Sequence, residues 1–76
     1  MKEQMKGGGD KMNINLPFIK RMREEKGLSM QDMAELLGFK SAPAYFHYEK
    51  GERKFRADML PVLARAFDCK IEDLYC

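Results

Sequence analysis

The segment from Leu28 to Gly51 constrains the fold of this chain most, because it predicts two short helices joined by a tight turn. Apolar residues in its first half recur at the i, i+3, i+4, i+7 spacing of a buried helix face, at Met30, Met33, Ala34 and Leu37. Gly38 follows this run directly, and glycine in that position is typical of a helix end. Gly51 marks the end of the second helix in the same way. Two helices in succession, with no strand pattern elsewhere in the chain, predict an all-α fold.

Capping residues and stop signals predict the other helix boundaries. Asn15 and Ser29 are typical N-cap residues, and Asp32 can complete a capping box with Ser29. Ser41 offers a cap to the next helix, whose first turn tolerates Pro43. Five helices are expected, over about 16–26, 30–37, 42–50, 58–67 and 71–75, the fourth beginning at either 58 or 61. Residues 1–14 are expected to form a flexible tail, and residues 15–76 the folded domain.

Helical spacing also predicts which side chains are buried. Tyr45 and Tyr48 lie three residues apart and are expected on the buried side of their helix, with Phe46 and His47 on the opposite side. The fourth helix should bury Leu60, Leu63, Ala64 and Phe67, and the last should close the core with Ile71, Leu74 and Tyr75.

Length and composition exclude several classes of protein. A chain of 76 residues forms one domain with a modest core, which leaves little room for a catalytic cleft. No apolar run approaches the roughly 20 residues that cross a bilayer, and no secretory signal is present, so we expect a cytoplasmic protein. Cys69, Cys76 and the single His47 lack the spacing of metal ligands. We therefore expect no metal, no cofactor, no small-molecule ligand and no enzymatic activity.

Positive charge is concentrated in one region. The net charge is +2, but residues 40–56 hold five basic and two acidic side chains, and residues 57–76 hold two basic and four acidic ones. A local excess of positive charge suits a polyanionic partner. The alternative is that these side chains form an ordinary solvated surface.

The order and spacing of several short motifs resemble the phage repressor/Cro-type helix-turn-helix domains, also called the XRE family, over roughly residues 16–75. The matching residues are Ile19-Lys20-Arg21-Met22-Arg23, Gly27-Leu28-Ser29, Met33-Ala34, Gly38, Tyr48-Glu49-Lys50-Gly51, Leu63-Ala64 and Leu74. The resemblance implies a compact five-helix bundle of the lambda-repressor-like type, whose second and third helices read double-stranded DNA. It also implies a transcriptional regulator, expected to be a repressor, and an ion pair between Arg23 and Glu49 that orients the third helix.

In this family the start of the third helix enters the major groove, where base edges can be read. The candidates for phosphate contacts are Gln31, Lys40, Lys50, Arg53 and Lys54. The candidates for base contacts are Ser41, Ala42, Phe46 and His47. Alanine and phenylalanine can pack on a thymine methyl group, and a histidine can donate to purine N7 or O6. The alternatives are that Phe46 is a packing residue and that His47 is an ordinary surface histidine.

The sequence supports one main hypothesis about partners and one alternative. A single small domain makes few DNA contacts, so we expect a homodimer on a near-palindromic operator, or the N-terminal part of a larger dimeric repressor. A second hypothesis is a protein-interaction or dimerisation module, because Phe46 lies close to Pro43 and Ala44 and makes the surface of the third helix unusually apolar.

Overall fold

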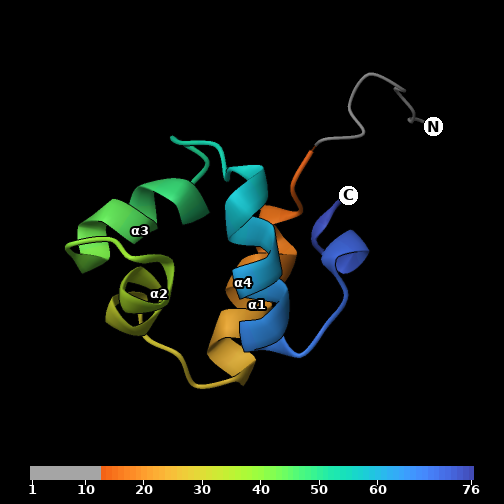
Figure 1. The fold of residues 1–76 in the computed structure, drawn as a ribbon, viewed down its shortest axis with the longest axis horizontal. Coiled ribbons are helices and arrows are strands. Elements are labelled where there is room, and N and C mark those ends of the chain that lie inside the picture. The colour runs from red at the N-terminus through yellow and green to blue at the C-terminus, as the bar shows by residue number, and fades with distance from the viewer. Residues whose placement is uncertain (1–12) are drawn as a thin grey trace.

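The computed structural model describes residues 13–76, which form a bundle of short helices (Figure 1). Four are α-helices: α1 (Leu16–Glu25), α2 (Met30–Leu37), α3 (Ala42–Glu49) and α4 (Leu60–Phe67). Two are 3-10 helices: η2 (Ala57–Met59) and η3 (Ile71–Leu74). The all-α class is confirmed, but the expected fifth helix is the single 3-10 turn η3. No helix within residues 13–76 combines the length and the apolar character that crossing a membrane requires.

The two ends of the described chain lie against each other. Ile14 and Tyr75 form an isolated antiparallel bridge, and the amide of Asn15 donates to the carbonyl of Leu74 at 2.8 Å. Asn13 and Ile14 are therefore part of the folded domain, whereas the sequence placed them in the tail. The remainder of the expected tail, residues 1–12, lies outside the described residues.

Local capping explains where α1 and α2 begin. The side chain of Asn15 accepts from the amide of Phe18 at 3.2 Å. Ser29 Oγ accepts from the amide of Asp32 at 3.0 Å, and Asp32 accepts in return from the amide of Ser29 at 2.9 Å. These bonds confirm both predicted caps. Ser41 precedes α3 as expected, but its side chain makes no capping hydrogen bond, so that expectation was wrong.

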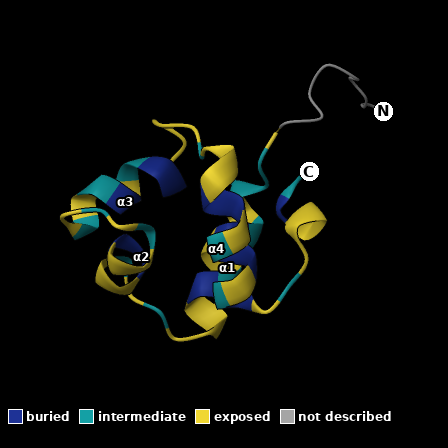
Figure 2. Ribbon diagram, in the orientation of Figure 1, coloured by how far each residue is buried: buried dark blue, intermediate teal, exposed yellow. Residues whose placement is uncertain are grey.

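The core lies between α1, α2, α3 and α4 and is completed by η3 (Figure 2). Its members are Ile19, Met33, Ala34, Tyr45, Leu60, Leu63, Ala64, Phe67 and Leu74. All four residues predicted for the buried face of α4 are among them. The prediction for the last segment was partly wrong, since Leu74 is fully buried but Ile71 is 40% exposed. A single 3-10 turn is too short to bury a continuous face.

Aromatic packing holds α3 between the segments that precede and follow it. Tyr45 is fully buried and Tyr48 nearly so, as their spacing predicted. The ring of Phe39, in the turn before α3, stacks on Tyr48 at 5.0 Å between centroids. Phe55, in the loop after α3, lies 5.4 Å from the same ring. These contacts hold α3 in place at both ends.

A buried ion pair links α1 to the end of α3. Arg23 Nε donates to Glu49 Oε2 at 2.9 Å, and Nη2 donates to Oε1 at 3.2 Å. Arg23 Nη1 also donates to the carbonyl of Leu28 at 3.0 Å, and the Tyr45 hydroxyl donates to Glu49 Oε2 at 2.7 Å. The hydrogen bonds that Arg23 donates to Glu49 raise the pKa of Arg23, and burial raises the pKa of Tyr45. These hydrogen bonds tie α1 and the loop at Leu28 to the end of α3.

We predict that Arg23→Ala lowers the free energy of unfolding by about 3–5 kcal/mol, because it leaves the buried Glu49 carboxylate without its cation. Urea denaturation measures this change. The control is Arg21→Ala, which removes an exposed pair with Glu25 at 3.9 Å and should cost less than about 1 kcal/mol. Arg23→Lys keeps the charge but not the two parallel bonds, and it provides a measurable intermediate if Arg23→Ala does not fold. Equal losses in Arg21→Ala and Arg23→Ala would contradict the structural role.

Acid should remove the contribution of the α2 capping box to the stability of the folded protein. The amide and hydroxyl of Ser29 lower the pKa of Asp32 below that of the unfolded chain. The stabilising effect of the Asp32 carboxylate is therefore complete above its unfolded-state pKa, and it is lost as pH falls through the lower folded-state pKa. We predict that Asp32→Ala lowers Tm at neutral pH and that its difference from the parent protein shrinks in acid. A Tm difference that stays constant with pH would contradict this.

Candidate nucleic-acid interface

Most of the residues expected to contact phosphates lie at the two ends of α3. Lys40 is exposed in the turn that leads into the helix, and Lys50, Arg53 and Lys54 are exposed where the chain leaves it. Gln31 is exposed in the first turn of the neighbouring α2, where its side-chain Nε2 donates to Glu35 Oε2 at 3.2 Å. The fold thus places positive charge at both ends of one helix.

The first turn of α3 offers few polar groups. The side chain of Ser41 is exposed and is not used as a cap, so its hydroxyl is available to a partner. Ala42 and Ala44 are partly buried, and Pro43 is exposed but has no amide proton. This turn can make apolar contacts and one hydroxyl hydrogen bond.

The chain reverses direction at the other end of α3. Gly51 adopts a left-handed conformation with φ +90, and a Cβ atom there would approach Leu16 Cδ1 to 3.1 Å. The amide of Glu52 then donates back to the carbonyl of His47 at 2.9 Å. This turn brings the Glu52 side chain beside the last turn of α3.

Glu52 contacts two of the residues predicted for DNA binding. One carboxylate oxygen lies 2.5 Å from His47 Nδ1, and the other lies 3.1 Å from Lys50 Nζ. The hydrogen bond with His47 lowers the pKa of Glu52 most, and the contact with Lys50 lowers it further. The carboxylate is therefore ionised at neutral pH and accepts from both side chains.

Sequence reasoning missed the contacts of Glu52, which it counted only as a negative charge. The signal was the position of Gly51: a left-handed glycine after a helix folds the next residue back toward the last turn. Arg56 is engaged in a similar way, with Asp58 at 3.4 Å. Within residues 13–76, the cations of the basic region with no ion pair are Lys40, Arg53 and Lys54.

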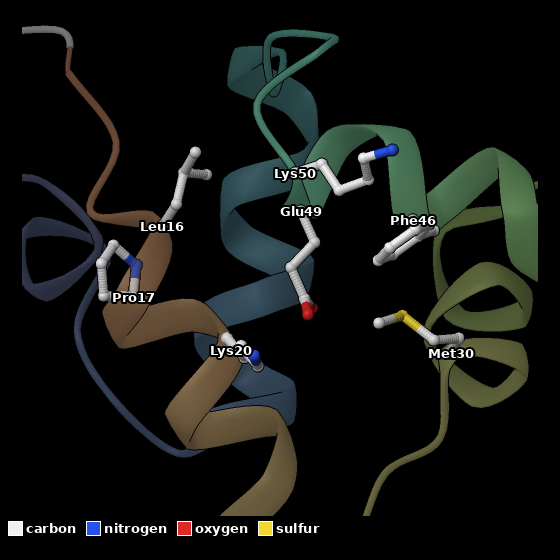
Figure 3. Close-up of a pocket in the computed structure, with 7 residues that line it drawn as sticks. All are labelled: Leu16, Pro17, Lys20, Met30, Phe46, Glu49 and Lys50. Carbon is white, nitrogen blue, oxygen red and sulfur yellow. The ribbon is translucent and has the colours of Figure 1, made fainter.

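An open groove of about 740 Å³ runs between α1, α2 and α3 beside this surface (Figure 3). It is lined by Leu16, Pro17, Lys20, Met30, Phe46, Glu49 and Lys50. Phe46 and Met30 lie on one side of the groove, opposite the α1 residues, and Lys50 Nζ lies 4.9 Å from the centre of the Phe46 ring. Phe46 is still 42% exposed, so it belongs partly to the packing and partly to the surface.

The described residues contain no group of three or more His, Cys, Asp or Glu side chains that could hold a metal ion. The chemistry of the surface is instead that of positive charge, hydrogen-bonding groups and small apolar side chains on one short helix. Such a surface can bind phosphates and contact the edges of bases.

Comparisons with known proteins agree with this geometry. The model of a helix-turn-helix family matches residues 19–74. A Thermococcus kodakarensis protein named "Putative HTH-type transcriptional regulatory protein" is 34% identical over 61 residues. The match covers 80% of this chain but 19% of that protein, so the chain spans about a fifth of the relative's length. No solved structure gives a significant match.

Proposed function

The chain belongs to the helix-turn-helix family, and from that premise we propose that it binds double-stranded DNA as a transcriptional regulator. The family match confirms the resemblance inferred from the sequence, and with it the expectation that the chain is not an enzyme. The observation that carries the proposal is the α2–α3 pair, in which α3 is exposed along one side. Among residues 13–76, Lys40 before α3 and Arg53 and Lys54 after it form no ion pair.

In the proposed complex, the first turn of α3 enters the major groove. Lys40 contacts phosphates at one end of the helix, and Arg53 and Lys54 contact them at the other. Gln31, near the N-terminus of α2, adds a neutral phosphate contact where the helix dipole also favours an anion. Lys50 contributes to phosphate binding when its pairing with Glu52 loosens.

Base contacts in this complex come from four side chains. The Ser41 hydroxyl can hydrogen-bond to base edges, and Ala42 and the exposed part of Phe46 can pack against thymine methyl groups. His47 supplies the fourth, through its imidazole ring. Since α3 offers few polar groups, phosphate contacts supply most of the affinity and base contacts a modest selectivity.

The proposal also covers the regulatory role of the protein, its location and its assembly on DNA. The relative's name supports a regulatory role. Repression, a cytoplasmic location and binding as a homodimer to a near-palindromic operator are proposed from the family resemblance. We also propose that the four α-helices with η3 correspond to the five-element bundle of the lambda-repressor-like type, in which two copies bind half-sites about one DNA turn apart.

Selection from random duplex DNA at low salt tests the proposal. We predict a selected sequence whose binding constant falls steeply with salt. Lys54→Ala should weaken binding to all sequences evenly and reduce the salt slope by about 1, because one phosphate contact is lost. Lys70→Ala removes the same charge after α4 and should leave both quantities unchanged. Failure to enrich any sequence and to bind DNA at low salt would reject the proposal.

The groove supports the second candidate, a protein-interaction module. An apolar ring that is 42% exposed beside a groove resembles an anchor residue for a protein partner. If this candidate is correct, Phe46→Ala should weaken self-association about 30-fold, and Arg53→Ala/Lys54→Ala should leave DNA affinity unchanged. Sedimentation equilibrium and a DNA-binding assay on the same variants separate the two functions. Loss of DNA affinity in the double variant without a change in solution mass would reject this candidate.

A further inference from the structure

The contact between His47 and Glu52 determines where the imidazole carries its proton. The Glu52 carboxylate is ionised and can only accept hydrogen bonds. Nδ1 of His47, 2.5 Å from a carboxylate oxygen, must therefore be the donor. A neutral imidazole has one N–H, so Nε2 of the neutral ring has an unshared electron pair and accepts hydrogen bonds.

Two other interactions hold Glu52 in this arrangement. Lys50 Nζ contacts its second oxygen at 3.1 Å, and the backbone bond from the Glu52 amide to the His47 carbonyl places the two residues side by side. The lone pair of Nε2 points in a different direction from the Nδ1–H bond, so one partner cannot occupy both nitrogens. The His47 side chain is 45% exposed, which leaves the ring accessible to a partner.

We propose that Glu52 positions His47 as a hydrogen-bond acceptor toward DNA, so that this chain selects a base with an exocyclic amino group. Adenine N6 and cytosine N4 present such donors in the major groove, whereas guanine N7 and O6 are both acceptors. This reverses the donor role that the sequence suggested for His47. The inference rests on the proposed DNA-binding function. Glu52 acts through His47 and does not contact the base.

The proton position can be measured without DNA. The chain contains a single histidine, so long-range ¹H–¹⁵N correlation spectra of the imidazole report on His47 alone. At a pH where the ring is neutral, we expect a protonated Nδ1 and an unprotonated Nε2. Glu52→Ala should shift the ring toward the Nε2–H form, and Glu72→Ala, which removes an exposed acid from η3, should not. An Nε2–H ring in the parent protein, or no change in Glu52→Ala, would overturn the proposal.

The base preference is tested by selection from random duplex DNA with three proteins. The parent protein should enrich adenine or cytosine at one position by about tenfold over guanine, the effect of one good base contact. His47→Ala should lose this preference, and Glu52→Ala should admit guanine there even if its overall affinity rises. In the selected duplex, purine in place of adenine, or a pyrimidinone without the amino group in place of cytosine, should weaken binding about tenfold. In an adenine-selected duplex, 7-deazaadenine should not.

The outcomes separate the inference from the function on which it rests. A selected sequence that is unchanged in His47→Ala, or a guanine preference that depends on His47, overturns the inference and leaves DNA binding intact. Absence of binding to any DNA at low salt overturns both. A preference that is lost in His47→Ala and relaxed in Glu52→Ala, but not in Glu72→Ala, supports the positioning role.

Discussion

The buried pair of Arg23 and Glu49 determines how α3 sits on the rest of the molecule. The helix has eight residues, too few to be stable alone, so its orientation comes from tertiary contacts. The Arg23 guanidinium on α1 binds both the loop carbonyl of Leu28 and the Glu49 carboxylate at the end of α3, and the Tyr45 hydroxyl donates to the same carboxylate. Because the two charges neutralise each other and both carboxylate oxygens accept hydrogen bonds, the pair can be buried, and it links the end of α3 to α1.

The turn after α3 determines which charged side chains of the basic region pair with one another. Gly51 directs the chain back along the helix, so Glu52 meets His47 and Lys50. The basic region thereby offers fewer unpaired cations to phosphates than its composition suggests. The same contact assigns a proton to His47. A single acidic side chain thus influences both the electrostatics of the surface and the hydrogen-bonding character of its one imidazole.

Features of this fold that depend on residues close together in the sequence could be predicted, and features that depend on distant residues could not. The caps at Asn15 and Ser29 and the buried face of α4 depend on residues within one or two turns, and all were predicted correctly. The burial of Ile71 was not predicted correctly, because η3 is a single 3-10 turn that is too short to bury a continuous face. Phe46 was only partly predicted: it is exposed, but α1 and α2 form the groove that it faces.

The sequence by itself determined the α-helices, most residues of the core, the concentration of positive charge and the family, because periodicity, capping and motif order are properties of nearby residues. It did not determine which charges are free and which nitrogen of His47 carries the proton. Tertiary structure decided these, because hydrogen bonds and ion pairs depend on ångström-scale distances that a turn at Gly51 creates. The sequence placed a histidine in α3, and the turn at Gly51 placed the Glu52 carboxylate against its Nδ1.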